Sequence, residues 1–112
     1  MPDLDAGDLF EGIPPRLDDE LLATLVEGGG VRIERIVSRG HSSPPGAWYD
    51  QPEDEFVLLV SGAARLEFEG GHTLELRPGH WVDLPAHLRH RVAWTDPDAD
   101  TVWLAVFRPP SS

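Results

Sequence analysis

The sequence predicts an all-β sandwich or barrel with one short helix near its start. One observation behind this prediction is a series of short apolar stretches at close, regular spacing, and the other is the Gly, Pro and Asp residues that separate them. These stretches predict strands at 48–51, 56–60, 64–68, 73–76, 81–84, 90–94 and 102–107. A further strand is predicted at 31–38, where charged and apolar residues alternate and would give one solvent-facing side.

The helix is predicted from Asp19 to about Val26. Its leucines share one stripe, Asp18 is a plausible N-cap, and the three glycines at 28–30 would end it. A chain of 112 residues is long enough for one domain. We therefore expect an arm and short helix packing on the barrel at 1–30, the barrel itself at 31–108, and a short tail at 109–112.

The composition excludes several classes of partner. The formal net charge is −11, all nine basic residues are Arg, and there is no Cys. A surface this acidic repels phosphate backbones and anionic lipids, so we expect neither nucleic acid nor membrane as a partner. Any metal site would have to use His, carboxylate, amide or phenol ligands. The start of the chain lacks the apolar core of a secretory signal, and a cytoplasmic location is expected.

Two spacings resemble the two motifs of the cupins, a family of small jelly-roll β-barrels. In the first, six residues separate Glu55 from Gly62. In the second, five residues separate a Gly from Pro85, and His90 follows at the family's spacing. The resemblance covers about residues 31–107 and implies a double-stranded β-helix, the jelly-roll barrel of the cupins.

The same motifs depart from the family pattern at several positions. Only Glu55 and His90 survive of the four usual metal ligands, since Tyr49 and Gln51 stand at the two His positions of the first motif. His87 replaces the Gly of the second motif. The resemblance implies a divalent metal, Fe, Mn, Ni or Zn, held by Glu55, His90 and the amide oxygen of Gln51. Tyr49 would supply a phenol or hold a bound water, and the alternative is a metal-free pocket whose polar groups hydrogen-bond one another.

The alignment to the first motif has an alternative. Pro52 stands where many cupins have Pro, which favours the spacing that puts Gln51 at a ligand position. A spacing one residue longer would put Trp48 and Asp50 at the two His positions. Asp50 would then be the ligand in place of Gln51.

Other histidines have weaker claims to a role. His87 lies three residues before His90 and could be a ligand, a general base or a solvent-facing turn residue. His41 lies in a Ser, Pro and Gly loop that could fold over the mouth of the barrel, or it could simply be solvated. His72 and His80 are expected on the surface, without a chemical role.

Three functions are open from the sequence. The first is a metal-dependent dioxygenase, isomerase or lyase acting on a small organic molecule, in which Tyr49 or His87 moves the proton. The second is a non-catalytic module that binds a small ligand or a metal, and the third is a metal-free, epimerase-like acid/base enzyme. Because both faces of the strands at 56–60 and 102–107 are apolar, we also expect a homodimer formed through the sheet.

Overall fold

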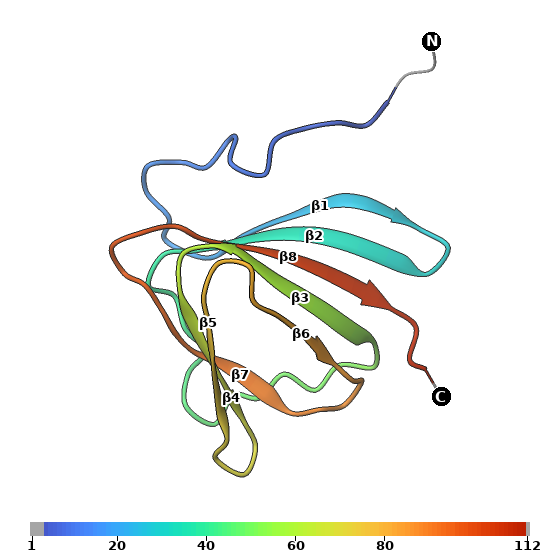
Figure 1. The fold of residues 1–112 in the computed structure, drawn as a ribbon, viewed down its shortest axis with the longest axis vertical. Helices are drawn as coiled ribbons and strands as arrows, with labels where there is room; N and C mark the ends of the chain where they lie inside the picture. The colour runs from blue at the N-terminus through green and yellow to red at the C-terminus, as the bar shows by residue number, and fades with distance from the viewer. Residues whose placement is uncertain (1–3, 112) are drawn as a thin grey trace.

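A computed structural model describes residues 4–111, and the regular elements in that part of the chain are all β-strands. They are β1 (Leu21–Gly28), β2 (Val31–Ser38), β3 (Asp54–Ser61), β4 (Ala64–Phe68), β5 (Thr73–Leu76), β6 (Trp81–Leu84), β7 (His90–Thr95) and β8 (Thr101–Arg108). One antiparallel sheet has the order β1-β2-β8-β3-β6 and the other the order β5-β4-β7. The two sheets are the two layers visible in Figure 1. The predicted all-β fold is confirmed, and within residues 4–111 no helix is long and apolar enough to cross a bilayer.

The predicted helix at 19–26 is wrong, because this stretch forms β1. Strand β1 pairs with β2 along its length, from Leu21 opposite Val37 to Gly28 opposite Val31. Gly29 and Gly30 have φ values of 61° and 82°, the left-handed conformation that a two-residue hairpin turn requires at both positions. The glycines therefore turn one strand into the next instead of ending a helix. A helix of this length is marginal by itself, whereas the strand gains a full ladder of hydrogen bonds.

The stretch predicted as a strand at 48–51 is also irregular. Only Tyr49 takes part in a β-bridge, opposite His90 at the start of β7. Hydrogen bonds run both ways across this bridge, with 2.7 Å from the Tyr49 nitrogen to the His90 oxygen and 3.2 Å in the other direction. The bridge fixes the chain just before β3 against the chain that enters β7.

The hydrophobic core lies between the two sheets. From Trp103 to Phe107 of β8, every second residue is buried and faces the other sheet, as the two-residue period of a strand dictates. The core residues from all the strands that meet there are Val57, Leu59, Ala64, Leu66, Leu76, Leu84, Trp103, Ala105 and Phe107.

Gly62 lies where the chain leaves β3 in one sheet and enters β4 in the other. Its φ is 88°, and a Cβ atom built on it would lie 2.3 Å from Thr101 Oγ1 and 2.5 Å from the Cα of the same residue. No side chain fits in that space. The Gly of the first motif is thus explained by the close approach of two backbones, at Gly62 and Thr101.

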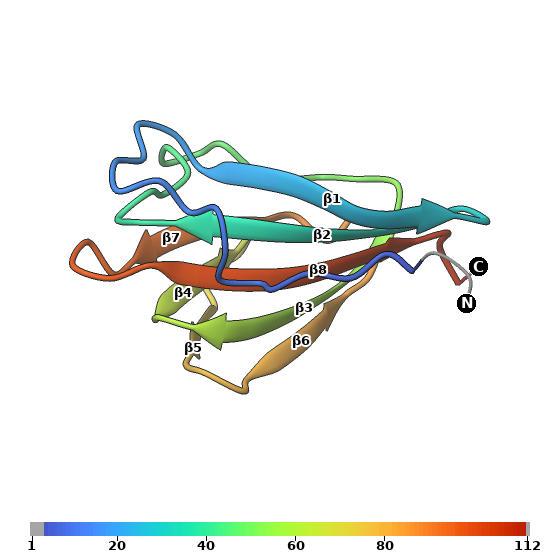
Figure 2. The same ribbon diagram turned by 90° about the horizontal axis from the view of Figure 1, so that it is seen from above.

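The N-terminal arm runs along the outer side of the five-stranded sheet, away from the three-stranded sheet (Figure 2). Arg35 of β2 points outward and donates from Nη1 to the carbonyl oxygens of Leu9, at 3.1 Å, and Glu11, at 2.6 Å. The side chain of a buried arginine therefore holds the arm through two backbone carbonyl groups. Residues 1–3 and 112 of the predicted arm and tail lie outside the described residues.

Candidate functional site

A cavity of about 200 Å³ opens between the two sheets. Its walls are largely apolar and include Val57, Leu66, Trp103 and Phe107. Six polar or phenolic side chains also line it, and they are Glu20, Glu34, Tyr49, Gln51, Glu55 and His90. A mostly apolar cavity with a few convergent polar groups is the usual form of a small-molecule site.

Strand register explains how the two strand carboxylates reach this cavity. Glu34 of β2 lies opposite Ala105 of β8, and Glu55 of β3 lies opposite Phe107. Cross-strand partners share a face, and the β8 residues here face the interior. The alternation in 31–38 predicted that the charged side of this strand faces solvent. That prediction is wrong for Glu34, which faces the cavity.

Glu55 and His90 form the centre of the polar group. Glu55 Oε1 accepts a hydrogen bond from Gln51 Nε2 at 2.8 Å and lies 3.9 Å from His90 Nε2. The two side chains are only 10% and 6% exposed. Burial raises the pKa of Glu55 above its ordinary value, against the opposing effects of the Gln51 hydrogen bond and the His90 charge.

The imidazole of His90 is oriented by the backbone. Its Nδ1 lies 2.7 Å from the carbonyl oxygen of Leu88, and a carbonyl can only accept, so Nδ1 carries the proton. In the neutral form of the ring the lone pair is then on Nε2, the nitrogen that lies 3.9 Å from Glu55 Oε1. The ring of Tyr49 lies beside the imidazole, with the two ring centroids 5.6 Å apart, although Tyr49 itself is 46% exposed.

Tyr49, Gln51, Glu55 and His90, all predicted from the motifs, are thus brought together around one cavity. Gln51 lines it and Asp50 does not, since the Asp50 carboxylate instead lies 2.8 Å from His87 Nδ1 outside the cavity.

His87 lies on an exposed turn and does not line the cavity. Its φ of 64° is the one positive value of a residue other than Gly within residues 4–111. This left-handed conformation explains why the family motif has Gly at the position. The backbone N–H of His87 donates to the carbonyl oxygen of Gln51 at 2.8 Å, so the turn holds the segment that carries the Gln51 side chain.

The remaining histidines have no contact with the cavity. His41 Nδ1 accepts a hydrogen bond of 2.9 Å from the backbone of Arg39, and its Nε2 lies 3.2 Å from the Asp18 oxygen. It fixes its own loop. His72 and His80 are exposed, as predicted.

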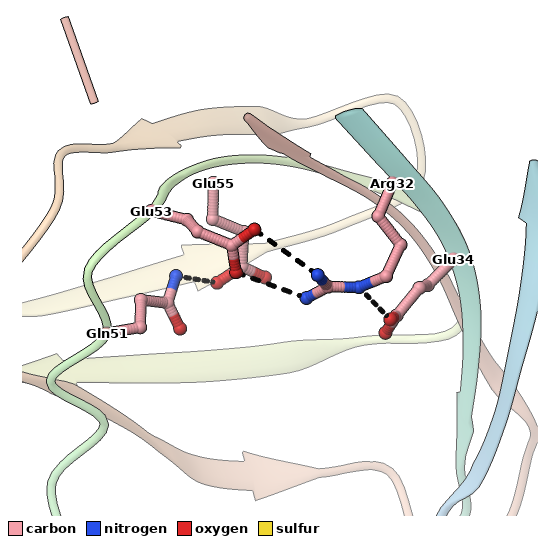
Figure 3. Close-up of polar contacts among 5 residues, drawn as sticks. All are labelled: Arg32, Glu34, Gln51, Glu53 and Glu55. Atoms are coloured by element: carbon pink, nitrogen blue, oxygen red, sulfur yellow. Dashed lines mark hydrogen bonds and ion pairs between the residues drawn. The ribbon is translucent and has the colours of Figure 1, made fainter. Parts of the chain in front are cut away.

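Sequence reasoning missed Glu20 and Glu34. Figure 3 shows how Glu34 is held: Arg32 Nε donates to it at 2.5 Å, while the other guanidinium nitrogens donate to Glu53 at 3.2 and 3.3 Å. These hydrogen bonds, that to Glu34 first, raise the pKa of Arg32. Glu20 Oε2 accepts a hydrogen bond of 2.7 Å from the hydroxyl of Ser38. The alternation in β2 was the available signal for Glu34, but it does not say which face is inward.

The donor atoms in the cavity do not fit a resident metal as they stand. Only Glu55 and His90 direct ligand atoms toward a common point, and within residues 4–111 no group of three His, Asp or Glu side chains could hold an ion. Gln51 turns its NH₂ group toward Glu55, and an amide nitrogen is not a ligand. Catalytic metals in proteins usually have three protein ligands.

The comparisons with known proteins agree with this geometry. The family described as the cupin domain matches residues 34–107, which carry both motifs and every strand from β3 to β7. The chain belongs to the cupin family. The comparison with curated proteins gives no match.

Solved structures show the same fold. A "putative mannose-6-phosphate isomerase" from Ralstonia eutropha JMP134 is 51% identical, with a TM-score of 0.89 over 93% of this chain and 97% of that one. A cupin superfamily protein from Desulfitobacterium hafniense DCB-2 is 20% identical, with a TM-score of 0.71 over 87% and 84%. The DMSP lyase of Ruegeria pomeroyi DSS-3 is 20% identical, with a TM-score of 0.67 over 81% and 47%. Proteins with these different names share one fold, so function has to be argued from the site.

Proposed function

We propose that this cupin is a small-molecule isomerase or lyase in which Glu55 and His90 transfer the proton. The observation that carries the proposal is the pair itself: two buried side chains, 3.9 Å apart, at the wall of a cavity that admits a small organic molecule. The name of the Ralstonia eutropha relative supports an isomerase, and this chain covers nearly all of that protein.

The two residues have complementary roles in this proposal. His90 Nε2 has a free lone pair and removes a proton from the carbon next to a carbonyl group. Glu55, whose pKa is raised by burial, donates a proton to the carbonyl oxygen. Protonation of the former carbonyl carbon by His90, while Glu55 takes back a proton from the neighbouring hydroxyl group, gives an isomerase. Departure of a β-substituent with its bonding electron pair, while Glu55 takes back its proton from the enol, gives a lyase. Gln51 holds Glu55 in place, and Tyr49 beside His90 stays a predicted proton carrier.

Proton abstraction from carbon can be detected before the natural substrate is identified. A panel of small aldoses, ketoses, amino sugars and β-substituted amines is incubated with the protein in D₂O, and loss of carbon-bound protons is followed by proton NMR. We expect exchange with at least one member, and a fall of about 100-fold or more in Glu55→Gln and His90→Gln. His72→Gln is the control for an exposed histidine. Exchange that persists in both cavity variants would contradict the assignment.

Metal-dependent chemistry with Gln51, Glu55 and His90 as ligands is the second candidate. The observation in its favour is the hydrogen bond from His90 Nδ1 to a backbone carbonyl, an arrangement that metal-binding imidazoles commonly have. Gln51 would have to turn its amide oxygen inward. Elemental analysis of protein purified without chelator or affinity-tag metal decides this. Near-stoichiometric Fe, Mn, Ni or Zn, lost in Glu55→Ala and His90→Ala, would replace the metal-free proposal.

A further inference from the structure

The cavity carries more negative charge than its neighbours neutralise. Arg32 is shared between the carboxylates of Glu34 and Glu53, so this group keeps one negative charge. Glu20 adds another. Among residues 4–111 the cavity lining includes no arginine, and the chain has no lysine at all. A negative excess beside a low-dielectric cavity attracts cations and repels anions.

Glu20 is held in place by a chain of hydrogen bonds from the core. The indole nitrogen of Trp103 donates to Ser38 Oγ at 3.2 Å, and the Ser38 hydroxyl donates to Glu20 at 2.7 Å. Ser38 is fully buried, so this carboxylate is fixed at the wall beside the Trp103 ring. A second cavity of about 240 Å³ shares Glu20, Tyr49 and Val92 with the first. The Glu20 carboxylate therefore lies where the two cavities meet.

Two polar atoms that are open to the cavity make no hydrogen bond to another side chain or to the backbone within residues 4–111. They are His90 Nε2 and Glu55 Oε2, on side chains at least nine-tenths buried. His90 Nε2 in the neutral ring and Glu55 Oε2 in the carboxylate form can each accept a hydrogen bond from a ligand or from water. The charge excess and these acceptors favour the same kind of ligand, one that is positively charged and donates hydrogen bonds.

We propose that the ligand of this cavity carries a protonated amine, which binds between Glu20 and Glu34 against the Trp103 ring, and that phosphorylated compounds are excluded. This inference rests on the proposed function, since it assigns the substrate class of the same cavity. The carboxylates supply the charge, and the apolar wall of the cavity, which includes Trp103, contacts the rest of the ligand. Phosphate finds no partner here, because the one nearby guanidinium, that of Arg32, already binds two carboxylates.

Three probes with the same four-carbon chain test the charge preference. Butylammonium, 1-butanol and butyrate have head groups that are positive, neutral and negative, and inorganic phosphate is the fourth probe. Binding to chelator-treated protein is measured from NMR shifts of the Trp indole protons. We expect butylammonium to bind about tenfold or more tightly than 1-butanol, and neither butyrate nor phosphate to bind.

Variants locate the binding position. Glu20→Gln and Glu34→Gln are each expected to weaken butylammonium binding about three- to tenfold while leaving 1-butanol binding unchanged, since the amides still accept the bonds from Ser38 and Arg32. Glu75→Gln, on the exposed strand β5, makes the same change in net charge far from the cavity and should alter neither.

Three results would overturn the proposal. Equal affinity for butylammonium and 1-butanol would contradict the proposal of a cationic ligand. Binding of butyrate or phosphate in place of butylammonium would contradict it as well. In both cases the proton exchange assay in D₂O could still succeed, so the isomerase or lyase would stand. Stoichiometric binding of Mn²⁺ or Zn²⁺ without any binding of butylammonium would instead assign the negative charge to a metal site.

Discussion

A single residue, Gly62, allows the close approach of two backbones between β3 and β4. Gly62 has both a left-handed backbone and no room for a Cβ atom, because the backbone of Thr101 lies against it. We expect Gly62→Ala to lower the free energy of unfolding by more than about 2 kcal/mol, as strain and overlap act together. Urea unfolding followed by Trp fluorescence measures the loss.

A comparison with a second glycine separates the cost of backbone strain from the cost of overlap with Thr101. Gly46 has a similar φ of 80°, but nothing lies within 4 Å of where its Cβ would be. Gly46→Ala should therefore cost only the backbone strain, about 1 kcal/mol. Equal losses in the two variants would show that overlap with Thr101 contributes nothing, and would contradict the explanation of the motif glycine.

Strand β3 is tied at its first residue to two other segments. Asp54 accepts hydrogen bonds from the Ser111 hydroxyl at 2.7 Å, the Ala86 nitrogen at 2.7 Å and the Ser111 nitrogen at 3.1 Å. These bonds, with that from the Ser111 hydroxyl first, lower the pKa of Asp54. The carboxylate thus joins β3 to the turn before β7 and to the chain after β8.

The lowered pKa of Asp54 gives stability a defined pH dependence. A carboxyl group whose pKa falls on folding stabilises the protein above its ordinary pKa, and this contribution is lost as the pH falls through the lowered value. We expect the wild type to lose stability below about pH 4, and Asp54→Asn to be less stable near neutral pH and to show a flatter acid limb. Urea unfolding at a series of pH values tests this, with Asp98→Asn in an exposed loop as control. An unchanged acid limb in Asp54→Asn would refute the assignment.

The homodimer expected from the sequence stays a prediction. Strand β1 is at the edge of the five-stranded sheet, and it exposes Leu22, Leu25 and Val26. An open strand edge with apolar side chains is a natural surface for pairing with a second copy. We expect light scattering after size-exclusion chromatography to give twice the monomer mass, and Leu25→Glu to shift the protein to the monomer. A monomeric wild type at micromolar concentration would contradict the prediction.

The sequence by itself determined the β-fold, the strands from β2 to β8 and the residues of the two motifs. These follow from short-range rules: strand period, turn residues and the spacing of Glu55, Gly62 and His90. The same rules failed at 19–26, because a leucine stripe before a glycine run fits a short helix and a hairpin strand equally well. Only pairing with β2, a contact between distant residues, decides between them.

Tertiary structure alone decided that Glu20 and Glu34 share the cavity with the motif residues. Alternation in β2 separates two faces but does not say which is inward, and here the face with Glu34 is inward because β8 places its partner Ala105 in the core. The distance between Glu55 and His90, the lone pair on His90 and the support of Glu20 by Ser38 depend on contacts between segments far apart in the chain. Charge excess in the cavity is a sum over such contacts, and no local pattern in the sequence contains it.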